Sequence, residues 1–150
     1  MLQVFVDNRQ IALLINEESA QTLAADVLAC EKQQAHELAI HFVDEKEIAA
    51  MHDEFFDDPS VTDCISFPVD DETETHYRVL GEIFVCPQVA IDYAEEHQGD
   101  PYEETSLYVA HGILHLLGYR DIEEEDRKEM RLAEQRVMQS LRSQHKLIKK

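Results

Sequence analysis

One short segment, residues 111–121, constrains this chain more than any other. His111 and His115 are four residues apart, so on an α-helix of about 3.6 residues per turn their side chains lie on the same face. Gly118 follows three residues later, and glycine commonly ends helices because it enters the left-handed conformation without a Cβ clash. The sequence therefore predicts a helix that carries two imidazoles and then turns sharply.

A third metal ligand is available just beyond this turn. If the chain reverses at Gly118, Asp121 returns toward His111 and His115 and offers a carboxylate oxygen. Three protein ligands leave the fourth tetrahedral position of zinc to water, as in catalytic zinc sites. Bound zinc lowers the pKa of that water from about 15.7 toward about 7. The segment therefore predicts a zinc hydrolase with His111, His115 and Asp121 as ligands.

Each of these residues also has a purely structural interpretation. The histidines lie beside an apolar stripe at helical spacing, where a lone histidine is more often a core residue. Asp121, with Glu124 three positions later, resembles the capping box of a helix. We favour metal binding because two histidines at this spacing rarely precede a glycine turn and a carboxylate by chance, and Asp121 could serve both roles. The stripe comprises Leu107, Ala110, Leu114 and Leu117.

The residue after the first histidine argues against ordinary peptide hydrolysis. Zinc proteases with a His-Glu-x-x-His helix use that glutamate as general base, and the position is Gly112 here. A zinc metallopeptidase is therefore an alternative that lacks its usual base.

Three sequence blocks resemble the YbeY family of bacterial zinc-dependent endoribonucleases. The run HGILHLLGY at 111–119 resembles the family signature, TDCISFP at 62–68 resembles its TDVLSFP block, and LGEI at 80–83 resembles its LGDI strand. The blocks occur in the family's order. The resemblance implies an α/β fold and zinc-dependent cleavage of single-stranded RNA. It also implies a role in rRNA maturation at the small-subunit 3′ end and in ribosome quality control, with the small ribosomal subunit or its assembly factors as partners.

The chain departs from this family pattern at two positions. The family's third histidine ligand falls on Asp121, and an arginine six residues before the Thr62–Asp63 pair falls on Phe56. Zinc accepts aspartate oxygen at about 2.0–2.2 Å, so the first change is chemically workable, although the added negative charge makes the bound water less acidic. If the family's arginine holds phosphate, the second change removes that contact.

The upstream blocks supply further candidate site residues. The resemblance implies that the segment with Thr62, Asp63 and Ser66 lines the cleft beside the metal, where these groups could orient phosphate or water. Local turn capping by Thr62 and Asp63 is an equally open interpretation, and Ser66 could be an ordinary strand hydroxyl. Glu82 could accept a hydrogen bond from a ligating histidine, or could simply be an exposed strand residue.

The charge of the chain is unusual for a nucleic-acid-binding protein. Thirteen basic and 32 acidic residues give a net charge of −19, whereas such proteins usually present basic surface. Residues 120–150, however, carry nine basic and seven acidic residues. The end of this segment is a candidate phosphate or ribosome contact, or simply a solvated helix end. The acidic surface and Phe56 also support an alternative, a non-catalytic ribosome-assembly factor with structural zinc. The terminal cations are Arg142, Lys146, Lys149 and Lys150.

Length and composition predict one domain, residues 1–150, in the cytoplasm. A chain of 150 residues buries about 70% of its unfolded surface as one compact domain. Cys30, Cys64 and Cys86 are odd in number and lack Cys-x-x-Cys spacing, so we expect reduced cysteines. We see no signal peptide or membrane span, and we expect neither membrane nor DNA as a partner.

Periodicity predicts a small mixed β-sheet covered by helices, an α/β (α+β) fold with the metal helix in the C-terminal half. The acidic segment 70–75, which contains no apolar residue, is predicted to be a hairpin loop between the last two strands. Strands are expected at 2–6, 37–43, 64–69 and 78–86, and helices at 17–33, 44–56, from 87, from 101 through the histidines, and at 122–141.

Overall fold

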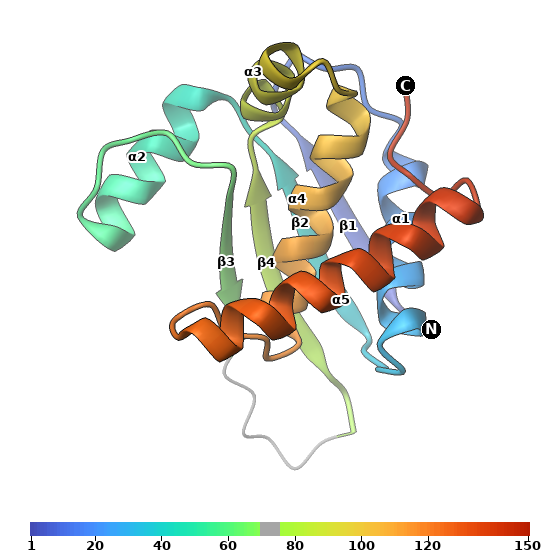
Figure 1. Ribbon diagram of the computed structural model, residues 1–150. Coiled ribbons are helices and arrows are strands. Elements are labelled where there is room, and N and C mark those ends of the chain that lie inside the picture. Colours follow the sequence, from blue (N-terminus) through green and yellow to red (C-terminus); the bar gives the residue numbers. More distant parts are fainter. Residues whose placement is uncertain (70–75) are drawn as a thin grey trace.

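The computed structural model describes residues 1–69 and 76–150 and confirms the predicted α/β class (Figure 1). The predicted hairpin loop at 70–75 lies outside the described residues. Within the described ranges the strands are β1 (Gln3–Asn8), β2 (Glu37–Phe42), β3 (Cys64–Pro68) and β4 (Val79–Val85). The helices in the same ranges are α1 (Glu17–Cys30), α2 (Glu45–Phe56), α3 (Pro87–His97), α4 (Pro101–Leu116) and α5 (Glu124–Ser143).

The strands form a mixed sheet in the order β1-β2-β4-β3. β1 and β2 pair in parallel, as do β2 and β4, whereas β3 runs antiparallel to β4. Helix α4 packs against β3 and β4, α1 packs against β1, and α5 crosses over α1 and α4 (Figure 1). The helix with the two histidines therefore lies between the sheet and α5, and α2 projects from the edge next to β3.

The core joins these layers through apolar side chains that follow the predicted periodicities. Alternate residues of β2 are buried, as expected for a strand covered on that face. An apolar stripe on α5 is also buried, because hydrophobic residues at helical spacing gain free energy when they leave water. Its members are Met130, Ala133, Val137 and Leu141.

Gly112 allows α4 to lie very close to the sheet. A Cβ at this position would lie 2.8 Å from Cys64 Sγ, closer than such atoms pack, and 3.0 Å from Ile83 Cγ2, a tight contact. On the same side of the helix, the Ser66 hydroxyl donates a hydrogen bond of 3.3 Å to the Gly112 carbonyl. The glycine that argues against a peptidase therefore has a packing role, and it sets the depth of His111 on α4.

The sequence prediction for the start of the last helix was wrong. The helix was expected from Ile122, with Asp121 as its cap in the alternative interpretation, but α5 begins at Glu124, with Glu123 as N-cap in a capping box with Asp126. Two acidic pairs here have the three-residue spacing of a capping box, Asp121 with Glu124 and Glu123 with Asp126. The structure uses the second pair. The Asp121 carboxylate is therefore not committed to the helix end.

None of the helices in the described ranges is long and apolar enough to cross a membrane.

Candidate metal centre

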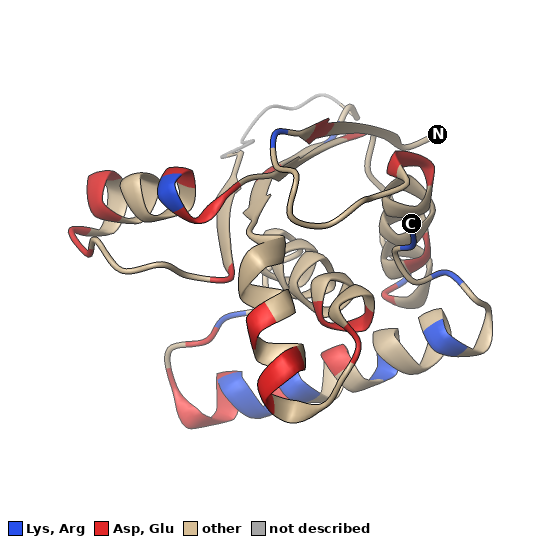
Figure 2. Cartoon of the chain, turned by 90° about the horizontal axis from the view of Figure 1, so that it is seen from above, with Lys and Arg blue, Asp and Glu red and all other residues tan. Residues whose placement is uncertain are grey.

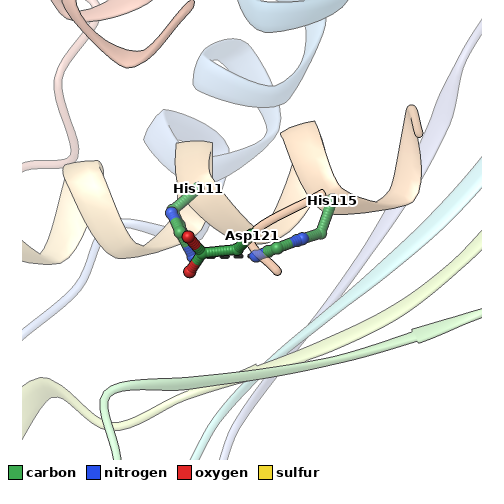
Figure 3. A group of neighbouring side chains, drawn as sticks. All are labelled: His111, His115 and Asp121. Atoms are coloured by element: carbon green, nitrogen blue, oxygen red, sulfur yellow. Dashed lines mark hydrogen bonds between the residues drawn. The ribbon is translucent and has the colours of Figure 1, made fainter. Parts of the chain in front are cut away.

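Helix α4 brings its two histidines together on its outer side. The Nε2 atoms of His111 and His115 lie 3.0 Å apart, and their rings meet edge to face at 84°. Gly118, at φ +111°, then turns the chain in the region that favours glycine. Asp121 lies on the bend that follows, and its side chain reaches the same place (Figure 3). One ligand atom from each of the three residues lies within 4.8 Å of the others, so this group could hold a metal ion.

The remaining ring nitrogens identify the tautomer of each histidine. His111 Nδ1 lies 2.5 Å from Glu134 Oε2, and His115 Nδ1 lies 3.0 Å from the Tyr119 carbonyl oxygen. Both partners accept hydrogen bonds, so each Nδ1 carries the proton and each neutral ring has its lone pair on Nε2. This pattern of outer acceptors is typical of metal-binding histidines.

The two Nε2 lone pairs therefore face each other at 3.0 Å, an arrangement that is favourable only with a proton or a cation between them. Tetrahedral zinc with Zn–N bonds of about 2.0–2.1 Å holds two nitrogens about 3.3 Å apart. The spacing, the outer acceptors and a nearby carboxylate fit a divalent transition metal.

The protonation of the histidine pair is asymmetric. Burial, and then the neighbouring charge of His111, lower the pKa of His115. Burial also opposes charge on His111, but the hydrogen bond to Glu134 and the charge of that carboxylate outweigh it and raise the pKa of His111. His115 therefore offers a free lone pair over a wider pH range than His111 does.

A cleft of about 530 Å³ opens beside His111 and Glu134. Thr62 and Asp63, from the turn before β3, line it, and Glu104 of α4 completes the acidic wall. Burial, followed by the charge of Asp63, raises the pKa of the Glu104 carboxyl. A carboxyl group with a raised pKa thus shares one cleft with a candidate metal site, an arrangement suited to hydrolytic chemistry.

The structure separates the candidate residues of the upstream blocks. Thr62 and Asp63 lie in the cleft, with the Thr62 hydroxyl 3.4 Å from Asp63 Oδ1. Ser66 lies instead at the contact between β3 and α4, where it bonds the Gly112 carbonyl. Glu82 is exposed on β4, as its simpler interpretation predicts, and its carboxylate lies 2.9 Å from His41 Nε2.

Glu134 has the role of histidine acceptor that was one of the two interpretations of Glu82. It was missed because it is 23 residues from its partner in the chain. One signal was available, since Glu134 directly follows a member of the buried α5 stripe and is therefore placed at the edge of the helix interface.

Two cations of the C-terminal end are already paired within the protein. Arg142 Nη2 lies 2.5 Å from Glu103, and Lys146 Nζ lies 3.4 Å from Asp26. Figure 2 shows Lys and Arg spaced along α5 and acidic residues at the start of α4. These pairs reduce the positive charge that this end can offer to phosphate.

A family model described as Endoribonuclease YbeY matches residues 5–142 of the chain. The chain belongs to this family. It is 46% identical over 142 residues to Endoribonuclease YbeY of Protochlamydia amoebophila, an alignment that covers 95% of each chain. It is 40% identical over 151 residues to Endoribonuclease YbeY of Chlamydia abortus, which covers 98% of this chain and 96% of the relative. These matches confirm the family resemblance and make this chain a member of an endoribonuclease family.

A solved structure shows the same fold as this YbeY-family chain. The solution structure of a protein from Thermotoga maritima matches 96% of this chain and 95% of its own, with a TM-score of 0.61 and 22% sequence identity. At this identity the likeness supports the fold alone.

Proposed function

We propose that this YbeY-family chain is a zinc-dependent endoribonuclease that cleaves single-stranded RNA. The proposed zinc ligands are His111 Nε2, His115 Nε2 and an Asp121 carboxylate oxygen. The observation that carries the proposal is the 3.0 Å approach of His111 Nε2 and His115 Nε2, with each Nδ1 already bonded to an acceptor. The family membership supplies the reaction class.

We further propose the biological setting that the family resemblance implies. The chain acts in the cytoplasm as one domain, on rRNA at the small-subunit 3′ end and in ribosome quality control, with the small subunit or its assembly factors as partners. Among the described residues, those that line the cleft include no Lys or Arg. Because duplex binding relies strongly on neutralising phosphates, this lining favours a single strand over a duplex.

In this proposal zinc supplies a polarised water or a positive charge for a phosphate oxygen. Glu134 and the Tyr119 carbonyl hold the two imidazoles in their ligating tautomers. In the cleft, Asp63 accepts a proton from the attacking group, which is either water or the RNA 2′-hydroxyl. Thr62 donates a hydrogen bond to a phosphate oxygen. Glu104, whose pKa is raised by burial, delivers a proton to the oxygen that leaves phosphorus.

The proposal is tested by removing and restoring the metal. Protein stripped with a chelator is dialysed and reloaded with one equivalent of zinc, then mixed with a labelled single-stranded RNA that contains the small-subunit rRNA 3′ end. We expect cleavage by the reloaded protein, little cleavage by the stripped protein, and none by the His111→Ala/His115→Ala double variant. Equal cleavage by all three preparations would exclude a metal-dependent reaction at this site.

One other function is favoured by a specific observation. The cleft is acidic, and Phe56, at the family's arginine position, is 56% exposed, so a non-catalytic assembly factor with structural zinc is the second candidate. Co-sedimentation of zinc-loaded protein with small ribosomal subunits, without cleavage of free or subunit rRNA, would favour this role over the nuclease.

A further inference from the structure

A buried carboxylate lies one layer behind the metal centre. The side chain of Glu31, the residue after α1, is 5% exposed. It accepts a hydrogen bond of 2.5 Å from the Tyr119 hydroxyl and bonds of 3.0–3.1 Å from Arg136 Nε and Nη2. Arg136 Nη2 also donates to the Tyr119 hydroxyl oxygen at 3.1 Å. Because an ionised carboxylate at this depth needs charged and hydrogen-bonding partners, these three residues form a closed network.

Tyr119 connects this network to two proposed ligands. Its carbonyl oxygen accepts the hydrogen bond from His115 Nδ1 at 3.0 Å, and its own N–H donates to the Leu114 carbonyl at 3.1 Å. Asp121 follows two residues later. The position of the Tyr119 ring therefore fixes both the carbonyl that orients His115 and the point from which the chain reaches Asp121.

The bend itself has little other support. Arg120 and Asp121 are exposed, and neither side chain makes a hydrogen bond or ion pair within residues 1–69 and 76–150. The next side-chain hydrogen bond to this segment is downstream, where Arg127 Nη1 donates to the Ile122 carbonyl at 3.1 Å. The proposed carboxylate ligand thus lies between two anchors, and the upstream anchor is Tyr119.

Helix α5 supports both histidines by separate routes. Glu134 bonds His111 directly, and Arg136, two residues later on the same helix, reaches His115 through Glu31 and Tyr119. One rigid element therefore aligns both imidazoles, and the second route also joins the end of α1 to the bend.

We propose that Tyr119, Glu31 and Arg136 are positioning residues that set the metal affinity of this chain. The network holds the His115 ring and the start of the bend in the geometry that lets Asp121 complete the ligand set. The inference depends on the proposed metal site, and it does not depend on RNA being the substrate.

The test measures zinc affinity by competition with a chromophoric chelator. Tyr119→Phe removes only the hydroxyl and keeps the ring and the carbonyl. We expect it to weaken zinc binding about 10-fold, since loss of an outer partner typically costs about 10–100-fold in metal affinity. Glu31→Gln and Arg136→Lys should act in the same direction. The Tyr119→Phe/Arg136→Lys double variant should lose less than the product of the single effects, because both residues act through Glu31.

Matched controls separate positioning from general stability. Tyr102→Phe removes a hydroxyl with a similarly short bond, 2.6 Å to the Leu14 carbonyl, and Arg142→Lys alters the α5 ion pair with Glu103. Neither control should change zinc affinity. The visible spectrum of bound cobalt, which reports ligand geometry, should change in Tyr119→Phe and remain as in wild type in Tyr102→Phe.

The outcomes distinguish this inference from the proposed function. If Tyr119→Phe and Glu31→Gln bind zinc as tightly as wild type with an unchanged cobalt spectrum, the inference is overturned, even if thermal unfolding of the metal-free protein shifts. If the affinities fall as expected but no preparation cleaves RNA, the inference holds and the nuclease proposal fails. If wild type takes up no zinc, the metal site fails and the inference fails with it.

Discussion

The two halves of the metal centre are built in different ways. His111 and His115 lie on a helix whose inner face is fully buried, and each has its outer nitrogen bonded to an acceptor. Asp121 lies on an exposed bend, and in the described part of the chain its side chain makes no hydrogen bond. Local helix spacing therefore creates the first half of the site, whereas the second half depends on contacts between distant segments of the chain.

The largest expected effect comes from the helical half. His115→Ala removes one imidazole and leaves two potential ligands, too few for a three-ligand zinc site. We expect zinc content to fall from one equivalent to near zero and RNA cleavage to fall to background, as measured on the same preparation by elemental analysis and a cleavage assay. Retention of a full equivalent of zinc would show that the metal binds elsewhere.

At Asp121, on the bend, the effect of a substitution should depend on whether the new side chain can bind zinc. Asp121→Asn keeps the shape but removes the charge, and an amide oxygen is a poor zinc ligand, so we expect zinc binding to weaken about 100-fold, or about 2.7 kcal/mol. Asp121→His supplies an imidazole and should bind zinc at least as well as wild type. If the affinity of both variants equals that of wild type in chelator competition, Asp121 is not a ligand and the site has only its helical half.

Much of the helical half could be predicted from the sequence, because it depends on short-range patterns. The spacing of the histidines, the glycine turn and the buried stripe of α5 all follow from helix geometry. The alternative interpretation of Asp121 as a helix cap is wrong, because two acidic cap spacings overlap there and only the fold selects between them. The outer partners could not be predicted, since Glu31 and Arg136 are 105 residues apart in the chain.

The outer acceptor of His111 offers a smaller, pH-dependent effect. Zinc must displace a proton from His111, whose pKa is raised through Glu134 in spite of burial. Zinc affinity should therefore rise with pH and level off above that pKa. The zinc affinity of Glu134→Gln should level off at a lower pH. Its limiting value should be about 10-fold weaker than that of wild type, because the ring is held less firmly. Affinities measured across the pH range of 5.5–8.5 test both effects, and identical curves for the two proteins would remove Glu134 from the site.

The same raised pKa affects the stability of the metal-free protein. A histidine whose folded pKa exceeds its unfolded value of about 6.5 stabilises the fold fully below that unfolded value. This contribution is lost as pH rises through the folded pKa. We therefore expect metal-free wild type to have a higher free energy of unfolding than Glu134→Gln, with a larger difference at pH 6 than at pH 8. Urea unfolding at the two pH values measures it.

The smallest effect on zinc affinity concerns the depth of the metal helix. Gly112→Ala places a methyl group 2.8 Å from Cys64 Sγ and 3.0 Å from Ile83 Cγ2, so either these side chains or α4 must shift. We expect a loss of about 1–3 kcal/mol in the free energy of unfolding, with zinc affinity nearly unchanged, because both histidines move together with the helix. Gly99→Ala, where the nearest atom to the added Cβ is 3.9 Å away, is the control. Equal stability of Gly112→Ala and wild type would show that the close packing is not needed.

The central claim is that the lone pairs of His111 Nε2 and His115 Nε2 face each other and bind one divalent cation. Nitrogen-15 NMR of the imidazole rings during a zinc titration tests it most directly. We expect the two Nε2 signals to shift together and saturate at one equivalent, while both Nδ1 atoms stay protonated. Zinc-induced loss of the proton from either Nδ1, or saturation without a change at either Nε2, would contradict the account.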